Sequence, residues 1–344
     1  MKIMAFGDIH FHNSHRFSNI ESQGYTTREI EQYSCADTLI RIAKEENIDK
    51  VVFLGDAWQA VGDTISAETQ SIMIEFFAQL RRYLPNLTVI LGNHDLIANN
   101  PAINKLNFLK YMPPIEFYCI PEVKNDFVYM PYCLNDDEAI RFLEAIPNKH
   151  DKIIFSHLEL GGINLGNGIV TQKGVPLDLL KEFKMTLQGH YHSGGSYGHK
   201  IQIAGSTQRL SFKDKGIARN NILIYDTETD KVTRKSFESP DWLTFDDDNI
   251  ENLPKIDNNN YVKVDLTTDI LLTSEIKAKL EQVKNKTVHI DLTRISVNKQ
   301  VTDDISNQED NLDVIRKFVN KSDNANDKKE ELIQEGARLL NKVS

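Results

Sequence analysis

Short apolar segments that end in Asp, Asn or His side chains recur five times within the first 192 residues, most of them beside a glycine. Each segment is short and apolar enough to be a buried β-strand, and the glycine lets the chain turn. The polar side chains therefore fall at the carboxyl ends of strands, where open α/β sheets bind ligands. They are Asp8 and His10, Asp56, Asn93 with His94 and Asp95, His157, and His190 with His192.

Helical patterns separate the first three of these strands. Residues 25–47 and 66–80 have apolar side chains near helical spacing, between strands expected at residues 2–6, 51–54 and 88–91. This alternation predicts a parallel or mixed sheet covered by helices. Further strands are expected at residues 115–120, 127–130, 153–155, 185–187, 201–204 and 222–225, with a short helix at 177–183. We expect the last two strands to close a second sheet, packed on the first with helices outside.

The sequence changes in character after Pro240. A linker-like stretch covers residues 246–254, and a strand, a helix and a strand are then expected at 261–266, 274–283 and 287–295. This order indicates a small α+β domain. Two amphipathic helices are expected at 311–320 and 328–343. The predicted organisation is a large α/β domain at 1–237, a small domain at 238–300 and a helical extension at 301–344.

Composition places the chain among globular cytoplasmic proteins. Of its 344 residues, 40% are hydrophobic and 26% are charged. No apolar run approaches the ~20 residues of a membrane helix, and a strand at residues 2–6 leaves no room for a signal peptide. Cys35, Cys119 and Cys133 have no paired or metal-like spacing and are expected to be reduced thiols. The net charge of −10 gives no support to a broadly basic surface.

The strand-end residues have the chemistry of a dinuclear metal site. A lone histidine in such a position is usually structural, but Asp8, His10, Asp56, Asn93, His94, His157, His190 and His192 together make that explanation weak. Two divalent ions ~3.5–4 Å apart can clamp a phosphate and activate a water for in-line attack. One carboxylate between the ions bridges them, and neutral imidazoles leave enough positive charge to attract a phosphodiester.

The order of these motifs, D-x-H, G-D, G-N-H-D, H and G-H-x-H, resembles the calcineurin-like metallophosphoesterase superfamily over residues 1 to about 235. The resemblance implies a four-layer αββα sandwich. It also implies that Asp56 bridges two ions, that His94 stabilises or protonates the leaving oxygen, and that Asp95 orients His94. The ligand sets that it implies are Asp8, His10, Asp56 and His192 for one ion, and Asp56, Asn93, His157 and His190 for the other.

The segment Gly205-Ser206-Thr207-Gln208-Arg209-Leu210-Ser211-Phe212 resembles the corresponding segment of the SbcD nuclease family, and residues 158–162 after His157 resemble phage members of that family. This resemblance implies Mn²⁺-dependent 3′–5′ exonuclease action on duplex DNA and endonuclease action on single strands, with Mg²⁺ as the alternative metal. It implies an SMC-like ATPase partner of the SbcC type, a homodimer of nuclease domains, and a host-cytoplasmic location if the chain is phage-encoded. The small domain would cap the site and bind DNA, with phosphate contacts from Arg209, Lys213 and Lys215.

The two terminal helices each carry an apolar stripe that could dock on the coiled coil of the ATPase or fold back on the chain itself. The polar joint between them favours docking. The residues expected to contact the partner are Leu312, Ile315, Phe318, Val319, Leu332, Ile333 and Leu340.

One position departs from the family pattern. Many members have an acid or a histidine three residues after the bridging Asp, whereas this chain has Gln59, which cannot transfer a proton. Exonuclease activity would then be weaker or use another group. Two other functions remain open: a phosphatase or small-nucleotide phosphodiesterase on the same scaffold, and a non-catalytic scaffold subunit. The full ligand set argues against the scaffold subunit.

Overall fold

The computed structural model of the chain describes residues 1–13, 18, 20–21, 24–59, 66–164, 170–210, 212, 221–237, 239–256, 260–265 and 273–284, with the side chains of 283 and 284 excepted. The chain divides into two compact units, Met1–Val264 with Leu272–Asp291, and Asp265–Leu271 with Leu292–Ser344. Apart from Asp265, the second unit lies outside the described residues. The strand predicted at 287–295 and the helices predicted at 311–320 and 328–343 also lie outside them, and the predicted domain boundaries stay predictions.

In the described part of the chain, the first six-stranded sheet has the order β16-β15-β1-β2-β3-β6. Its strands are β1 (Lys2–Phe6), β2 (Lys50–Phe53), β3 (Leu87–Ile90), β6 (Glu116–Tyr118), β15 (Ile222–Asp226) and β16 (Lys231–Lys235). Strands β1, β2, β3 and β6 are parallel, so their carboxyl ends meet at one edge. We expected residues 222–225 in the second sheet. Strand β15 instead pairs antiparallel with β1 and, like β1, is buried on both faces.

The second six-stranded sheet has the order β13-β14-β12-β9-β8-β7. Its strands are β7 (Glu122–Lys124), β8 (Phe127–Met130), β9 (Ile153–Ser156), β12 (Met185–Gln188), β13 (Gly195–Tyr197) and β14 (Ile201–Ile203). Strands β8, β9, β12 and β14 are parallel. The carboxyl ends of β9 and β12 therefore lie at one edge of this sheet, as those of β1 to β3 do in the first.

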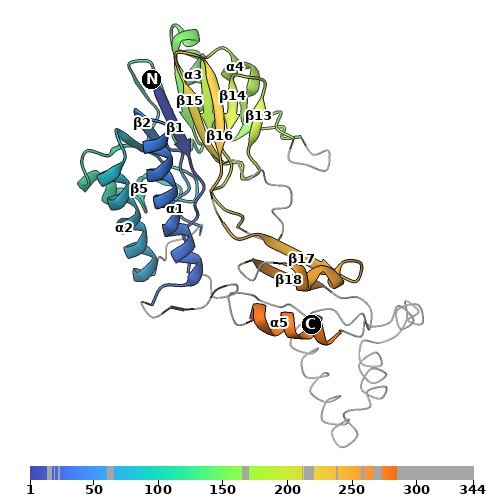
Figure 1. Ribbon diagram of the computed structural model, residues 1–344. Coiled ribbons are helices and arrows are strands. Elements are labelled where there is room, and N and C mark those ends of the chain that lie inside the picture. The colour runs from blue at the N-terminus through green and yellow to red at the C-terminus, as the bar shows by residue number, and fades with distance from the viewer. Residues whose placement is uncertain are drawn as a thin grey trace, which may run out of the picture. The chain divides into compact units, whose positions relative to one another are not determined.

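The two sheets pack face to face between two layers of helices (Figure 1). Along β1, Ile3 faces the second sheet and packs with Phe155, whereas Met4 faces the helical layer with Phe76. This alternation follows from the two-residue period of a strand. The outer helices are α1 (Thr27–Glu45) and α2 (Ala67–Tyr83) on the first sheet, and α3 (Asp136–Glu144) and α4 (Leu177–Lys181) on the second. The predicted four-layer αββα architecture is confirmed.

Local sequence explains where the two long helices begin. Thr26 and Glu29 form a capping box, in which each side chain accepts a hydrogen bond from the backbone N–H of the other. Ser66, the predicted N-cap of the second helix, accepts a hydrogen bond from the Thr69 N–H. None of the helices that the structure describes has both the length and the hydropathy of a membrane span.

The residues after β16 form a small module of two paired strands and a helix. Strand β17 (Trp242–Asp246) pairs with β18 (Tyr261–Asp265), and α5 (Ser274–Lys284) follows. A linker was expected at 246–254, but Asp246 ends β17 and residues Ile250–Lys255 form the 3₁₀ helix η4. Trp242 of β17 stacks on Tyr261 of β18 with ring centroids 4.4 Å apart, which stabilises the pair.

The remaining elements are short connections between the layers. They are β4 (Leu96–Ile97), β5 (Asn100–Asn104), η2 (Asn107–Tyr111), η3 (Lys149–Asp151), β10 (Leu160–Gly161) and β11 (Val175–Pro176).

Candidate metal centre

The loops that follow β1, β2, β3, β9 and β12 converge at the carboxyl ends of the two sheets. Two glycines permit this approach. A Cβ at Gly92 would lie 2.2 Å from Asp56 Oδ1, and one at Gly55, where φ is +96°, would lie 2.7 Å from His157 Nδ1. Asp8, His10, Asp56 and His190 themselves have positive φ, which is rare for residues with a side chain and is often found at functional sites.

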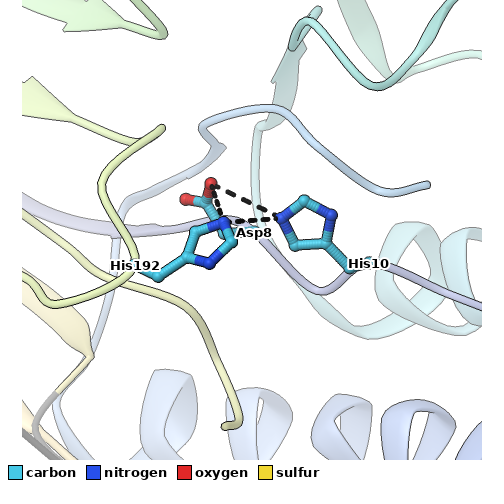
Figure 2. A group of neighbouring side chains, drawn as sticks. All are labelled: Asp8, His10 and His192. Atoms are coloured by element: carbon cyan, nitrogen blue, oxygen red, sulfur yellow. Dashed lines mark hydrogen bonds and ion pairs between the residues drawn. The ribbon is translucent and has the colours of Figure 1, made fainter. Parts of the chain in front are cut away.

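One cluster consists of Asp8, His10 and His192, whose side chains turn toward one another in Figure 2. The Nε2 atoms of the two histidines lie 3.0 Å apart. Asp8 Oδ1 lies 3.9 Å from His10 Nε2 and 4.0 Å from His192 Nε2. Nitrogen and oxygen atoms that face a common point at these distances are arranged as ligands around one ion would be.

A second cluster consists of Asp56, His157 and His190, with Asn93 beside it. His157 Nε2 lies 3.2 Å from Asp56 Oδ2, 3.0 Å from Asn93 Oδ1 and 3.3 Å from His190 Nδ1. Asn93 Oδ1 also lies 3.1 Å from His190 Nδ1. On its other side, the His157 ring is held by the Leu54 carbonyl, 2.6 Å from Nδ1, which fixes its orientation.

Asp56 lies between the two clusters. Its Oδ2 atom is 3.8 Å from His10 Nε2 in the first cluster and 3.2 Å from His157 Nε2 in the second. Its Oδ1 atom accepts a hydrogen bond of 2.8 Å from the His94 N–H. The structure thus brings together all of the predicted metal ligands, with Asp56 in the predicted central position.

Comparison with known proteins agrees with this geometry. The family model described as calcineurin-like phosphoesterase matches residues 1–200.

The chain belongs to the calcineurin-like phosphoesterase family.

No curated protein matches the chain. Among solved structures, a dimetal phosphatase from Danio rerio aligns with a TM-score of 0.36 at 12% identity, over 59% of this chain and 86% of its own. A double mutant of Vps29 from Entamoeba histolytica aligns with a TM-score of 0.26 at 12% identity, over 69% of this chain and 100% of its own. The assignment to this family of metal-dependent hydrolases rests on the family model.

The donor atoms of this calcineurin-like site fit divalent cations. Asp8 is fully buried, and its Oδ2 atom has no hydrogen-bond partner in the described part of the chain. A buried carboxylate oxygen without a partner is costly, and a cation would satisfy it. Burial disfavours the charged form of Asp8, and the Asp56 carboxylate adds to this, so the pKa of Asp8 lies above its usual range.

The histidines are set in different charge states by their surroundings. Burial lowers the pKa of His10 and of His190 to about 3 each, so both imidazoles are neutral and can offer a lone pair to a metal. Burial also works against a charge on His157, but the Asp56 carboxylate outweighs it and raises the pKa of His157 to about 9. The same pair lowers the pKa of Asp56 against the effect of its own burial.

His94 lies beside the site with its ring fixed by a backbone atom. Its Nδ1 atom is 2.6 Å from the Gln59 carbonyl oxygen, so Nδ1 is the donor of this hydrogen bond and Nε2 is the ring nitrogen left for other contacts. The His94 and His10 rings meet edge to face, 4.9 Å apart.

Asp95 differs from its expected position relative to His94. Its carboxylate is fully buried and accepts hydrogen bonds from the backbone N–H groups of Gly92, Asp56 and Trp58. Its contacts therefore hold the loops after β2 and β3 together. The partner of His94 Nδ1 is the Gln59 carbonyl, which any residue at that position could provide.

Two residues behind the metal loops were not found from the sequence. Gln32 of α1 is fully buried and donates hydrogen bonds to the Ile9 and His10 carbonyls. Lys105 is nearly buried, and its Nζ donates to the His94 carbonyl at 2.8 Å. Neither lies at a strand end, and a polar residue in a helix or a loop gives no local signal of such a contact.

Of the predicted DNA contacts, only Arg209 falls within the described residues. Its guanidinium lies 3.5 Å from the Trp242 carbonyl and 3.9 Å from the Asp241 carboxylate, at the junction with the β17–β18 pair. Lys213 and Lys215 lie outside the described residues, as do all the residues expected to contact the ATPase. Contact of Arg209 with DNA stays a prediction.

Proposed function

We propose that this chain is a dimetal phosphodiesterase that cleaves DNA, and that it serves as the nuclease subunit of an SbcCD-type end-processing complex. The observation that carries the proposal is Asp56, a buried carboxylate between two groups of imidazole and carboxylate ligands. A pair of divalent ions bound there would supply positive charge against the phosphate and a lowered pKa for the attacking water.

The ligands divide between the two metal positions along the lines of the two clusters. Asp8, His10 and His192 would hold one ion, and Asn93, His157 and His190 the other, with Asp56 bridging them. The imidazoles of His10 and His190 are neutral near pH 7, because the pKa of each is lowered to about 3, so each can offer a lone pair to a metal ion. Mn²⁺ suits this mixture of nitrogen and oxygen donors, and Mg²⁺, which prefers oxygen, is the alternative.

His94 is placed to act on the leaving group. The Gln59 carbonyl holds Nδ1, so Nε2 is the atom available to the substrate. As water attacks phosphorus and the P–O3′ bond breaks, a protonated Nε2 would pass its proton to the departing oxygen. Because His94 is held by a backbone carbonyl, the glutamine side chain at position 59 does not remove this function.

Two features support DNA as the substrate. The segment from Gly205 that resembles the SbcD family contacts the β17–β18 pair, because Arg209 donates to the Trp242 carbonyl at 3.5 Å. Arg28 stands at the same junction, 5.6 Å from the Trp242 ring and 5.9 Å from the Tyr261 ring. A module attached in this way can help to shape access to the site. A small-molecule phosphatase on this scaffold has no evident need for it.

Substrate comparison tests the proposal. With Mn²⁺, a blunt duplex labelled at its 5′ end should yield a ladder of shortened labelled strands, and circular single-stranded DNA should be cut to linear form. Both products should form about a hundred- to ten-thousand-fold more slowly in the His94→Ala variant. Rapid hydrolysis of p-nitrophenyl phosphate without any cutting of DNA would instead establish a phosphatase. A protein that binds Mn²⁺ but hydrolyses neither substrate would fit a scaffold subunit.

The proposed partners are an SMC-like ATPase and a second copy of the nuclease domain. Both rest on the resemblance to the SbcD family. The apolar stripes at 311–320 and 328–343 would provide the docking surface for the ATPase.

A further inference from the structure

The loop that presents Asp8 and His10 is held from two sides. On one side, its N–H groups donate to the loop after β2, from Asp8 to Gly55, from His10 to Asp56 and from Phe11 to Ala57. The carbonyl groups of Ile9 and His10 instead face helix α1. Asp8 and His10 both have positive φ, so the loop needs outside support to keep its shape.

Gln32 provides the support on the helical side. Its Nε2 atom donates to the Ile9 carbonyl at 3.0 Å and to the His10 carbonyl at 2.6 Å. Its Oε1 atom accepts from the His12 N–H at 3.4 Å. One buried carboxamide thus contacts three backbone groups, at residues 9, 10 and 12, around a metal-ligating histidine.

The helix end that carries Gln32 is itself firmly placed. Glu29 completes the capping box with Thr26 and also accepts a hydrogen bond from Thr69 of α2. Arg28 donates to the Arg209 carbonyl at 2.7 Å, and Glu31 accepts from the Tyr261 hydroxyl at 2.8 Å. Because this end of α1 is held by several contacts, Gln32 can keep the loop after β1 in a fixed position.

We propose that Gln32 is a positioning residue that sets the geometry of one metal position, the one formed by Asp8, His10 and His192, and leaves the other largely unaffected. The proposal rests on the dimetal site of the proposed function. We expect selectivity because His157 is oriented by the Leu54 carbonyl and Asn93 lies on the separate loop after β3. The links between the two positions run through the shared Asp56 and through the His190 N–H, which donates to Asp8 Oδ1 at 3.1 Å.

The Gln32→Met variant tests this, because methionine keeps the length of the side chain and removes both donors. We expect Mn²⁺ affinity at the Asp8/His10/His192 position to fall about tenfold or more, the effect typical of losing an outer-shell partner. Affinity at the other position should stay within about twofold. Isothermal titration measures the affinities, and anomalous scattering from Mn²⁺ in crystals identifies the position that loses occupancy.

The matched control is Gln79→Met. Gln79 of α2 also donates a hydrogen bond to α1, through Asp37 at 2.8 Å, and has no hydrogen bond to a metal loop among the residues that the structure describes. Its Mn²⁺ affinities should stay at the wild-type values at both positions, which would show that losing a glutamine contact to α1 does not by itself weaken metal binding. Should Gln32→Met fail to fold, Gln32→Glu keeps the shape of the side chain, sets a carboxylate against two carbonyls, and should show the same selective loss.

Unchanged affinity in the Gln32 variant, or an equal loss at both positions together with a lowered melting temperature, would overturn the proposal. Failure of the wild-type protein to cut DNA would count against the proposed substrate. It would not count against the role of Gln32, because the Gln32 test measures metal binding. A wild-type protein that binds no Mn²⁺ would remove the basis of both.

Discussion

Replacing His94 with alanine should separate proton donation from metal binding. The ring is fixed through Nδ1 by the Gln59 carbonyl at 2.6 Å, which leaves Nε2 as the proton donor to the leaving oxygen. General acid catalysis contributes about a hundred- to ten-thousand-fold, or roughly 3–5 kcal/mol of the activation barrier at 1.36 kcal/mol for each tenfold. We expect a loss of that size in the single-turnover rate of DNA cleavage by His94→Ala.

The leaving group provides a sharper test of the same role. In bis(p-nitrophenyl) phosphate the departing nitrophenolate is a stable anion that needs no proton, so His94→Ala should slow its hydrolysis by less than about tenfold. Mn²⁺ affinity, measured by isothermal titration, should be unchanged. His150→Ala is the matched control, because that side chain is 74% exposed on η3 and should leave both rates unaffected. Equal losses on the two substrates, or a loss of Mn²⁺, would refute the assignment of His94 as an acid that does not bind the metal.

Three further predictions concern the metals and the partner. Asp56→Asn should abolish binding of both Mn²⁺ ions, whereas Asp8→Asn should weaken one, as counted by isothermal titration; a single site lost in each case would contradict the bridging role. Because the pKa of His157 is raised to about 9, its ring is protonated near neutral pH and must lose that proton to bind a metal. Mn²⁺ binding should therefore release protons and tighten as the pH rises toward 9. Proton release makes the heat of binding depend on the ionisation enthalpy of the buffer, which isothermal titration in several buffers measures. The same heat of binding in every buffer would show the prediction wrong. A chain truncated after residue 300 should no longer co-purify with the ATPase subunit, and co-purification at full yield would exclude docking through the terminal helices.

The strand-end residues could be predicted from the sequence because their residue types are out of place beside apolar strands. Asp8, Asp56 and His157 each follow a run of buried side chains, where a charge or an imidazole needs a partner. The chain order of these motifs then identified the family. The layers followed from the same pattern, since strands buried on both faces require cover on both.

Other features depended on contacts that no local pattern records. Gln32 looks like any polar residue of a helix, and its role appears only when α1 lies against the loop after β1. Asp95 was expected to face His94, but residue type gives no direction, and its carboxylate binds three backbone N–H groups instead. The linker expected at 246–254 overlaps β17 only at Asp246, and β17 itself was not predicted, because it forms by pairing with β18, which no local pattern records.

The most direct test of the dinuclear site is a crystal structure of the protein grown with excess Mn²⁺, with anomalous scattering used to locate the metal. Two peaks about 3.5–4 Å apart, one on each side of Asp56, are the predicted result. A single peak, or two peaks that do not share Asp56, would contradict the account.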